Sequence, residues 1–481
     1  MSHESAPLHP SPRPAGRRAL TLTGLALVVV AVAALESFLL PALPHLQKEF
    51  GVDAATGALA TVAPTVTTVI VTPLAGRFAD VFGAKRTLAV LVCLVIAGGL
   101  VSAFAPVFGL FVVGQVLQGF GLGILPVSFV VIAAIFDSGS LKVASGVIVA
   151  MTVAGAGLGV LVAGPIVENL SRAVLFAAPV AIVIAGAIAF FAARPSLAVA
   201  ERGAPTRIDW AGSLLLAVAL VATVGWLGSL AAAGPFAPVP LVLLIVAVGA
   251  VASWIAVERT VAQPMIDVRT LRTRAVGGAV TVGLFIGAAY GVVVYLVPQQ
   301  IAQSPATGYG LGASATETGF FLAAAFGIAV IASPLAGVIA RRVGTTVVGV
   351  VGMGVLAAGA LVAAVSTQPI AIVVALLFAG IGASSASTAV FASAAGGAGE
   401  HEVGVSTALV TIARALGSAL ATQSVAAILA SGAVGGVPDL AGLRVAFLIG
   451  AVLAAIGAFL SLALPRAARP APLPAISGES A

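Results

Sequence analysis

Long apolar runs alternate with short polar breaks along almost the whole chain. The runs recur from residue 19 to about residue 464, and each is long enough, at about 20 residues, to cross a hydrocarbon core as a helix. Lipid offers the backbone no hydrogen bonds, and the runs lack the ten-residue alternation of a membrane barrel. The pattern therefore predicts an all-α polytopic membrane protein.

Polar and Pro/Gly-rich breaks divide the chain into about fourteen candidate spans. Composition agrees with this division, because 60% of the 481 residues are hydrophobic, against about 45–50% in soluble domains. We expect the spans to begin near residues 19, 56, 87, 109, 142, 174, 210, 239, 275, 316, 346, 370, 405 and 443.

Positive charge predicts the orientation of these spans, because Lys and Arg accumulate in cytoplasmic loops. With the N-terminus inside, 18 of the 22 Lys and Arg residues fall on the cytoplasmic side. Lys48, Arg172 and Arg444 fall outside, and Arg414 stays within a span. We therefore expect a multi-pass protein of the cell (inner or plasma) membrane with both termini in the cytoplasm.

Several classes of function are excluded by what the sequence lacks. Cys93 is the single cysteine, so we expect neither an intrachain disulfide nor a cysteine-based metal site. The four histidines are too scattered for a metal cluster, and no G-x-x-x-x-G-K-[ST] loop for ATP occurs. Because there is also no catalytic cluster and no sizeable soluble domain, we expect no enzyme, no cofactor and no nucleic-acid partner.

The chain repeats itself at an offset of 261 residues, which places residues 72–88 (TPLAGRFADVFGAKRTL) on residues 333–349 (SPLAGVIARRVGTTVVG). The same offset places the glycines of residues 119–121 on those of residues 380–382. One offset shared by separated segments predicts two copies of one unit. Both copies of the loop are basic, so both should face the cytoplasm with an even number of spans between them.

The loop at residues 72–88 fits the pattern G-x-L-A-D-R-x-G-R-K at Gly76, Ala79, Asp80, Gly83 and Lys85. In this loop the chain resembles the major facilitator superfamily, and particularly its fourteen-helix drug:proton antiporter subfamily. Residues 258–274 (ERTVAQPMIDVRTLRTR) are similar to the pattern E-x-R-x-x-x-P-M-x-D-L-R of the fourteen-helix members.

The resemblance implies the major facilitator fold, with two six-helix bundles, two linker helices and alternating access by rocking. We expect a monomer whose partners are the lipid bilayer, protons and a small-molecule substrate. The predicted parts are a disordered cytoplasmic tail at 1–18, the N-terminal bundle at 19–193, a linker with two extra transmembrane helices at 194–274, the C-terminal bundle at 275–464 and a cytoplasmic tail at 465–481.

In relatives the loop acts as a cytoplasmic gate. Glycines allow a tight turn, and a carboxylate can meet a helix N-terminus or a basic partner when the cytoplasmic side closes. We expect Asp80 to act in this way, although Val81 and Ala84 replace two basic residues of the family pattern. The predicted gate residues are Gly76, Arg77, Asp80, Gly83, Lys85 and Arg86.

Glu36 lies within the apolar run of ALESFLLPALPHL at residues 34–46, which resembles the subfamily segment L-D-x-T-x-x-x-x-A-L-P. A charged carboxylate in a span costs about 2.5–3.5 kcal/mol on insertion scales, so it should face a cavity or a partner. We expect Glu36 to couple proton movement to transport. The alternative is a structural partner of a Tyr, a Gln or Arg414.

Two further spans carry family-like glycine motifs. In VVGQVLQGFGLG, Gln118 and the following glycines match R-x-x-Q-G-x-G, with Gln115 in place of the Arg, and we expect both glutamines to line the substrate cavity. GAGLGVLVAGP is similar to the antiporter signature that ends in G-P-x-x-G-G. Close packing or bending of helices is expected at Gly155, Gly159, Gly164 and Pro165.

Arg414 lies near mid-bilayer, where a guanidinium needs a carboxylate, carbonyls or water. The subfamily has an Arg in a similar R-x-L-G setting, so we assign Arg414 to proton coupling together with Glu36. The alternative is a purely structural pairing. Tyr290 and Tyr295 complete the predicted substrate cavity.

Few polar groups among many aliphatic ones predict a cavity for hydrophobic or amphipathic solutes. The resemblance implies secondary active export of such compounds by proton antiport, and so multidrug efflux and drug resistance. The alternative is a facilitator or proton symporter for a nutrient or metabolite, which the missing Arg at Gln115 favours.

Overall fold

The computed structural model describes residues 15–136, 138–194, 209–234, 236–261, 273–396, 403–433 and 437–464. Within these ranges, fourteen helical spans are long and apolar enough to cross a membrane. The predicted all-helical, polytopic class and the predicted number of spans are therefore confirmed.

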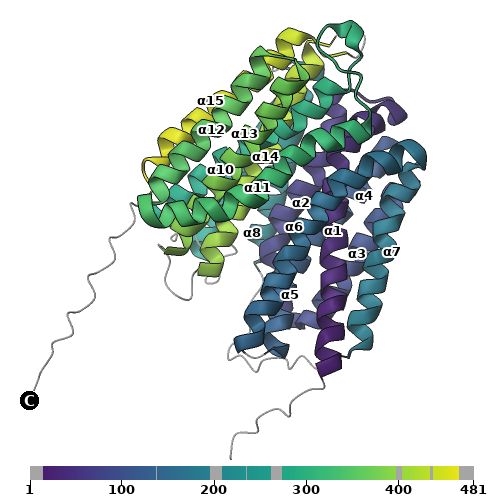
Figure 1. Cartoon of the computed structure of the whole chain (residues 1–481), viewed down its shortest axis with the longest axis vertical. Helices are drawn as coiled ribbons and strands as arrows, with labels where there is room; N and C mark the ends of the chain where they lie inside the picture. Colours follow the sequence, from purple (N-terminus) through teal and green to yellow (C-terminus); the bar gives the residue numbers. More distant parts are fainter. Residues whose placement is uncertain are drawn as a thin grey trace, which may run out of the picture. The chain divides into compact units, whose positions relative to one another are not determined.

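The first six spans lie within residues 15–192 (Figure 1). The fourth of these spans is broken at a glycine-rich 3-10 segment, η1, into two shorter α-helices. The elements are α1 (Ala15–Phe50), α2 (Ala54–Phe82), α3 (Ala84–Phe104), α4 (Phe108–Gln118), η1 (Gly119–Gly123), α5 (Ile124–Ile135), α6 (Ser138–Asn169) and α7 (Arg172–Ala192).

The remaining eight spans are single α-helices, and the 3-10 turn η3 lies in one of the loops between them. Their bounds are α8 (Trp210–Ala233), α9 (Pro238–Thr260), α10 (Arg274–Ile301), η3 (Pro305–Thr307), α11 (Ala315–Val343), α12 (Thr345–Val365), α13 (Pro369–Gly396), α14 (Val403–Ser431) and α15 (Leu440–Ser461).

The chain folds into two compact units, each of which is made of three separate segments of the sequence. The described residues within Met1–Ile266, Val294–Ala323 and Thr422–Leu443 form the first unit. Those within Asp267–Val293, Ala324–Ala421 and Arg444–Ala481 form the second. The first unit thus holds α1 to α9 and one end of α10, α11, α14 and α15. The domain boundaries expected from the sequence stay a prediction.

In the first unit α1 packs against α6 and α7 (Figure 1), α3 packs against α4 and α7, and α8 packs against α9 and α2. Glycines bring these backbones close together. An added Cβ at Gly24 of α1 would lie 2.6 Å from the backbone nitrogen of Phe190 in α7. In the second unit α12 packs against α13, and the Thr346 hydroxyl donates to the carbonyl of Leu464 at 2.8 Å.

The predicted internal repeat is visible in the backbone. Gly83 separates α2 from α3 with φ of 88°, and Gly344 separates α11 from α12 with φ of 91°. Both angles lie in a region that side-chain-bearing residues rarely adopt. The two glycines are 261 positions apart, so each copy makes the same turn at the same place.

The helix crossing that follows the turn is repeated as well. An added Cβ at Gly98 would lie 2.7 Å from the carbonyl oxygen of Gly114 and 2.8 Å from the Cβ of Leu117. At Gly359 it would lie 2.8 Å from the carbonyl oxygen of Ala375 and 3.0 Å from the Cβ of Phe378. Each residue of the second set lies 261 positions after its counterpart in the first.

The close approach of α12 to α13 predicts that a Gly→Val substitution lowers stability at one position of α12 and not at another. Gly359→Val inserts methyl groups where α13 is already in contact, and such overpacking costs about 1–3 kcal/mol. We expect a lower thermal unfolding midpoint and a lower yield of folded protein in detergent. Gly354→Val is the matched control, because nothing lies within 4 Å of a Cβ at Gly354. Equal behaviour of the two variants would contradict the crossing.

Candidate functional site

Glu36 lies within α1. The side chain is half-buried, and among the described residues no hydrogen bond or ion pair reaches it. Helical spacing places it on the same face of α1 as Val32 and Ala33. These two residues border a small cavity of about 20 Å³ together with Gly121 and Leu122 of η1. Glu36 therefore lies one helical turn along α1 from residues that border the break in the fourth span.

Helix α6 holds this part of α1 through glycines. An added Cβ at Gly155 would lie 2.2 Å from the carbonyl oxygen of Val30, and one at Gly159 would lie 2.7 Å from that of Ala34. Further along α1, Pro41 and Pro44 lie inside the helix and cannot donate to the carbonyls one turn before them. The segment around Glu36 is thus tightly packed against α6, and two intrahelical hydrogen bonds are missing in the turns that follow it.

Gln115 and Gln118 bind Ser102 of the neighbouring helix α3. Both side-chain nitrogens donate to the Ser102 hydroxyl at 2.9 Å, and all three side chains are buried. Both amide nitrogens therefore find their hydrogen-bond acceptor on the neighbouring helix α3. Their predicted place in a substrate cavity stays a prediction.

A second polar group in the first unit joins α1 and α2 to the end of α10. The Gln299 amide donates to the Gln47 side chain at 2.9 Å, and the Tyr295 hydroxyl donates to the carbonyl of Ala54 at 2.8 Å. Tyr295, Gln47 and Gln299 are all buried. The sequence analysis selected Tyr295 but missed both glutamines. The only sign of them in the sequence is an amide residue close to the end of an apolar run.

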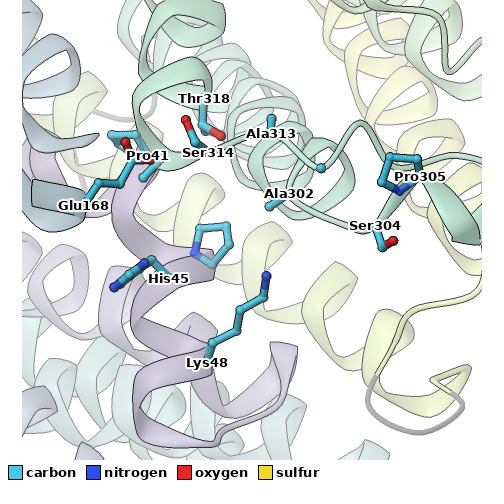
Figure 2. A pocket seen from close by; sticks show the side chains of 13 residues that line it. Pro41, His45, Lys48, Glu168, Ala302, Ser304, Pro305, Ala313, Ser314 and Thr318 are labelled. Atoms are coloured by element: carbon cyan, nitrogen blue, oxygen red, sulfur yellow. The ribbon is translucent and has the colours of Figure 1, made fainter. Parts of the chain in front are cut away.

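A cavity of about 490 Å³ lies at the same end of α1 (Figure 2). His45 and Lys48 of α1 line it, facing the loop between α10 and α11. On its other side, Glu168 of α6 accepts hydrogen bonds from the backbone nitrogen of Thr316, at 2.9 Å, and from the Thr316 hydroxyl. A carboxylate is favourable at the N-terminus of a helix, so Glu168 caps α11.

The loop that closes this cavity is anchored at Tyr309, whose hydroxyl donates to the carbonyl of Pro438. Burial and then the negative charge of Asp439 raise the pKa of Tyr309 above its usual value. The phenol therefore stays protonated near neutral pH and remains a hydrogen-bond donor.

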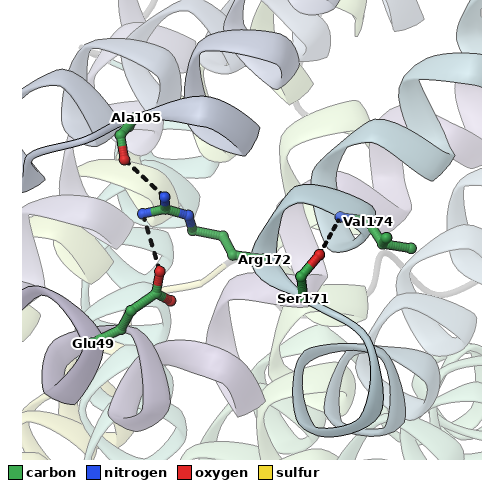
Figure 3. Close-up of polar contacts among 5 residues, drawn as sticks. All are labelled: Glu49, Ala105, Ser171, Arg172 and Val174. Carbon is green, nitrogen blue, oxygen red and sulfur yellow. Dashed lines mark hydrogen bonds and ion pairs between the residues drawn. The ribbon is translucent and has the colours of Figure 1, made fainter.

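Arg172 joins the ends of three helices in the first unit (Figure 3). Its guanidinium donates to the carbonyl of Ala105 at 2.7 Å, approaches Glu49 at 3.5 Å and lies 4.4 Å from the ring centre of Phe50. Ser171 precedes it and caps α7 by accepting from the backbone nitrogen of Val174 at 3.3 Å.

Arg414 belongs to the second unit, on α14. Its guanidinium lies 5.8 Å from the ring centre of Phe391 and near Tyr290 of α10. Its Nε has no hydrogen-bond partner among the described residues. Gly287 lets α10 approach here, since an added Cβ would lie 1.8 Å from the carbonyl oxygen of Arg414. Tyr290 and Arg414, both selected from the sequence, are thus neighbours.

The predicted cytoplasmic gate is only partly described. Gly83 makes the turn between α2 and α3, and Lys85 lies 5.9 Å from the ring centre of Phe191. Gly76 has no atom within 4 Å of an added Cβ, and Arg86 is exposed. The side chains of Arg77 and Asp80 lie outside the described residues. The role of the gate stays a prediction.

The sequence profile of the Major Facilitator Superfamily matches residues 25–422. No curated protein matches the chain. Solved structures similar in fold include the POT family transporter PepTSo (14% identity, TM-score 0.63, 94% of this chain and 97% of that chain). Others are the human organic anion transporter MFSD10 (18%, 0.57, 93% and 100%) and the nucleoside transporter NupG (12%, 0.65, 92% and 99%).

The Arg172 contacts predict a loss of stability on truncation. Arg172→Met removes a charged hydrogen bond and a cation–π contact, and we expect about 2 kcal/mol of destabilisation. Thermal unfolding in detergent measures it as a lower midpoint. Arg172→Lys keeps the charge but not the planar fork, so its midpoint should lie between those of the wild type and the Met variant. A Met variant as stable as the wild type would contradict the role of Arg172.

Proposed function

The chain belongs to the Major Facilitator Superfamily, and on this premise we propose that it exports small hydrophobic or amphipathic compounds in exchange for protons. Export would proceed by alternating access, from a cell membrane in which both termini face the cytoplasm. Within the superfamily we assign the chain to the fourteen-helix drug:proton antiporters, in agreement with its fourteen candidate spans and its linker motif.

The observation that carries this proposal is the unpartnered carboxylate of Glu36. A carboxylate that only stabilised the fold would be paired, because an isolated charge in a span is costly. Glu36 has no such partner among the described residues. This environment favours alternation between a proton-bound neutral form and a charged form that needs water or a cationic compound.

The exchange follows from these two forms of Glu36. A proton arriving from outside neutralises the carboxylate, which then no longer holds a cationic or polar compound. Loss of the proton toward the cytoplasm restores the charged form and its affinity. The Nε of Arg414 has no hydrogen-bond partner in the part of the chain that the structure describes, and we assign Arg414 to the same cycle, with Tyr290 as its neighbour on α10.

The alternative is a facilitator or a proton symporter for a nutrient or metabolite. Gln115 stands where antiporters of the family have an Arg, and its amide is engaged with Ser102, so this span offers no charged group for proton transfer. The similar folds belong to a POT family transporter, an organic anion transporter and a nucleoside transporter, so the fold is compatible with several substrate classes.

Transport assays in vesicles with an imposed proton gradient test the proposal. Glu36→Gln keeps the size of the side chain but cannot exchange a proton. We expect at least a tenfold loss of proton-driven export of a fluorescent lipophilic cation, with unchanged insertion into the membrane.

Glu317→Gln is the matched control. Glu317 accepts from the backbone nitrogen of Ser314 at 2.8 Å in a capping box at the start of α11, and Gln can serve in that motif. Unimpaired export by Glu36→Gln would remove the assignment. Accumulation driven in the same direction as proton entry would favour the symporter.

A further inference from the structure

Glu168 at the end of α6 holds the start of α11, which lies 148 positions further along the chain. One carboxylate oxygen accepts from the backbone nitrogen of Thr316 at 2.9 Å, and the other accepts from the Thr316 hydroxyl. The two helices belong to different copies of the internal repeat, since α6 precedes the linker helices and α11 leads into the repeated turn at Gly344. The contact therefore joins the two copies directly.

The start of α11 does not depend on Glu168 to form. Helix α11 has a complete capping box of its own, because the backbone nitrogen of Ser314 donates to the Glu317 carboxylate at 2.8 Å and the Ser314 hydroxyl accepts from the backbone nitrogen of Glu317 at 3.2 Å. Glu168 is exposed and Thr316 is half-buried, so water can hydrate both partners when they separate. The contact can thus break without unfolding α11.

Next to this contact α6 and α11 meet backbone to backbone. An added Cβ at Gly164 would lie 2.2 Å from the backbone nitrogen of Thr316, and one at Gly319 would lie 2.6 Å from the carbonyl oxygen of Val160. Small residues allow such close approach of helices in a membrane. Because glycine has no side chain, the helices can separate and meet again at these two positions without a change of rotamer.

The contacts between the two copies within the first unit gather at one side of the membrane. Helices of the second copy enter this unit by the ends that flank the loops between α10 and α11 and between α14 and α15. There the buried Tyr295 and Gln299 of α10 bind α2 and α1. Glu168, in contrast, is exposed and lines the cavity of about 490 Å³ (Figure 2). With both termini in the cytoplasm, this side is the outer one, and Glu168 lies at its solvent edge.

We propose that Glu168 is the latch of an outer gate formed by α6 and α11. Its charged hydrogen bonds, which are stronger than neutral ones, hold the two helices together while the outer side is closed. Their release lets α6 and α11 separate, so that a solute can pass on this side. The proposal rests on the alternating access of the proposed function, but on neither the direction of transport nor proton exchange at Glu36.

Labelling of a single cysteine by a membrane-impermeant maleimide, added to the outer side of vesicles, tests the latch. Cys93→Ser removes the native cysteine, and Thr318→Cys supplies the reporter. Thr318 lines the same cavity, is 1% exposed and has no hydrogen-bond partner for its hydroxyl among the described residues, so the cysteine breaks no hydrogen bond. In this background Glu168→Ala should raise the labelling rate about tenfold, because a charged hydrogen bond that favours the closed side is lost.

Glu317→Ala is the matched control. It disrupts the capping box at the same end of α11 but leaves the contact with α6 in place. It therefore measures how far fraying of α11 alone exposes the reporter, and we expect a labelling rate close to that of the parent. A rise as large as in Glu168→Ala would overturn the proposal, because Glu168 would then be a helix cap and no more.

Glu168→Gln is a second and milder variant. It keeps the size of the side chain and an acceptor oxygen for Thr316 but loses the charge, so its labelling rate should lie between those of the parent and of Glu168→Ala. The unfolding midpoint of each variant is measured first, so that misfolding is not mistaken for opening. Rates equal to that of the parent in both Glu168 variants would overturn the latch. Labelling requires no transport, so a failure of the proposed export would leave this test unaffected.

Discussion

Close backbone contact at glycines is the interaction on which the rest of this structure depends. Lipid is as apolar as the side chains, so helices in a membrane gain by packing rather than by leaving water. Here α6 meets α1 at Gly155, α3 meets α4 at Gly98 and α10 meets α14 at Gly287. Each contact brings a carbonyl or backbone nitrogen within reach of the partner helix. Helices held this closely keep fixed positions for the few polar side chains that they carry.

Those polar side chains fall into two kinds. Gln115, Gln118 and Ser102 satisfy one another inside one helix pair, as expected for groups whose desolvation must be compensated. Glu36 and the Nε of Arg414 are left without partners among the described residues. An unpaired charged group inside a membrane span lowers the stability of the protein. Such groups are typical of sites that move protons or solutes.

The ends of the helices carry a different chemistry from their centres. Glu168 caps α11, Arg172 joins α1, α3 and α7, and Asp53 caps α2 beside a cavity that α8 helps to form. Caps are needed because the terminal groups of a helix have no partners within it. Glu168 and Asp53 also line cavities, so two of these helix caps lie at the edge of a cavity.

Local properties of the chain were sufficient to predict its class. Span length and apolar content depend on neighbouring residues alone, and the fourteen spans agree with them. The 261-residue repeat is visible in the sequence itself, and the matching turns at Gly83 and Gly344 agree with it. The partners of the polar residues could not be predicted in this way. Whether Gln118 faces a cavity or Ser102, and that Gln47 meets Gln299 from 252 positions away, depends on which helix faces pack together. That choice belongs to the tertiary structure, because an amide in an apolar helix looks the same in the sequence whichever neighbour it binds.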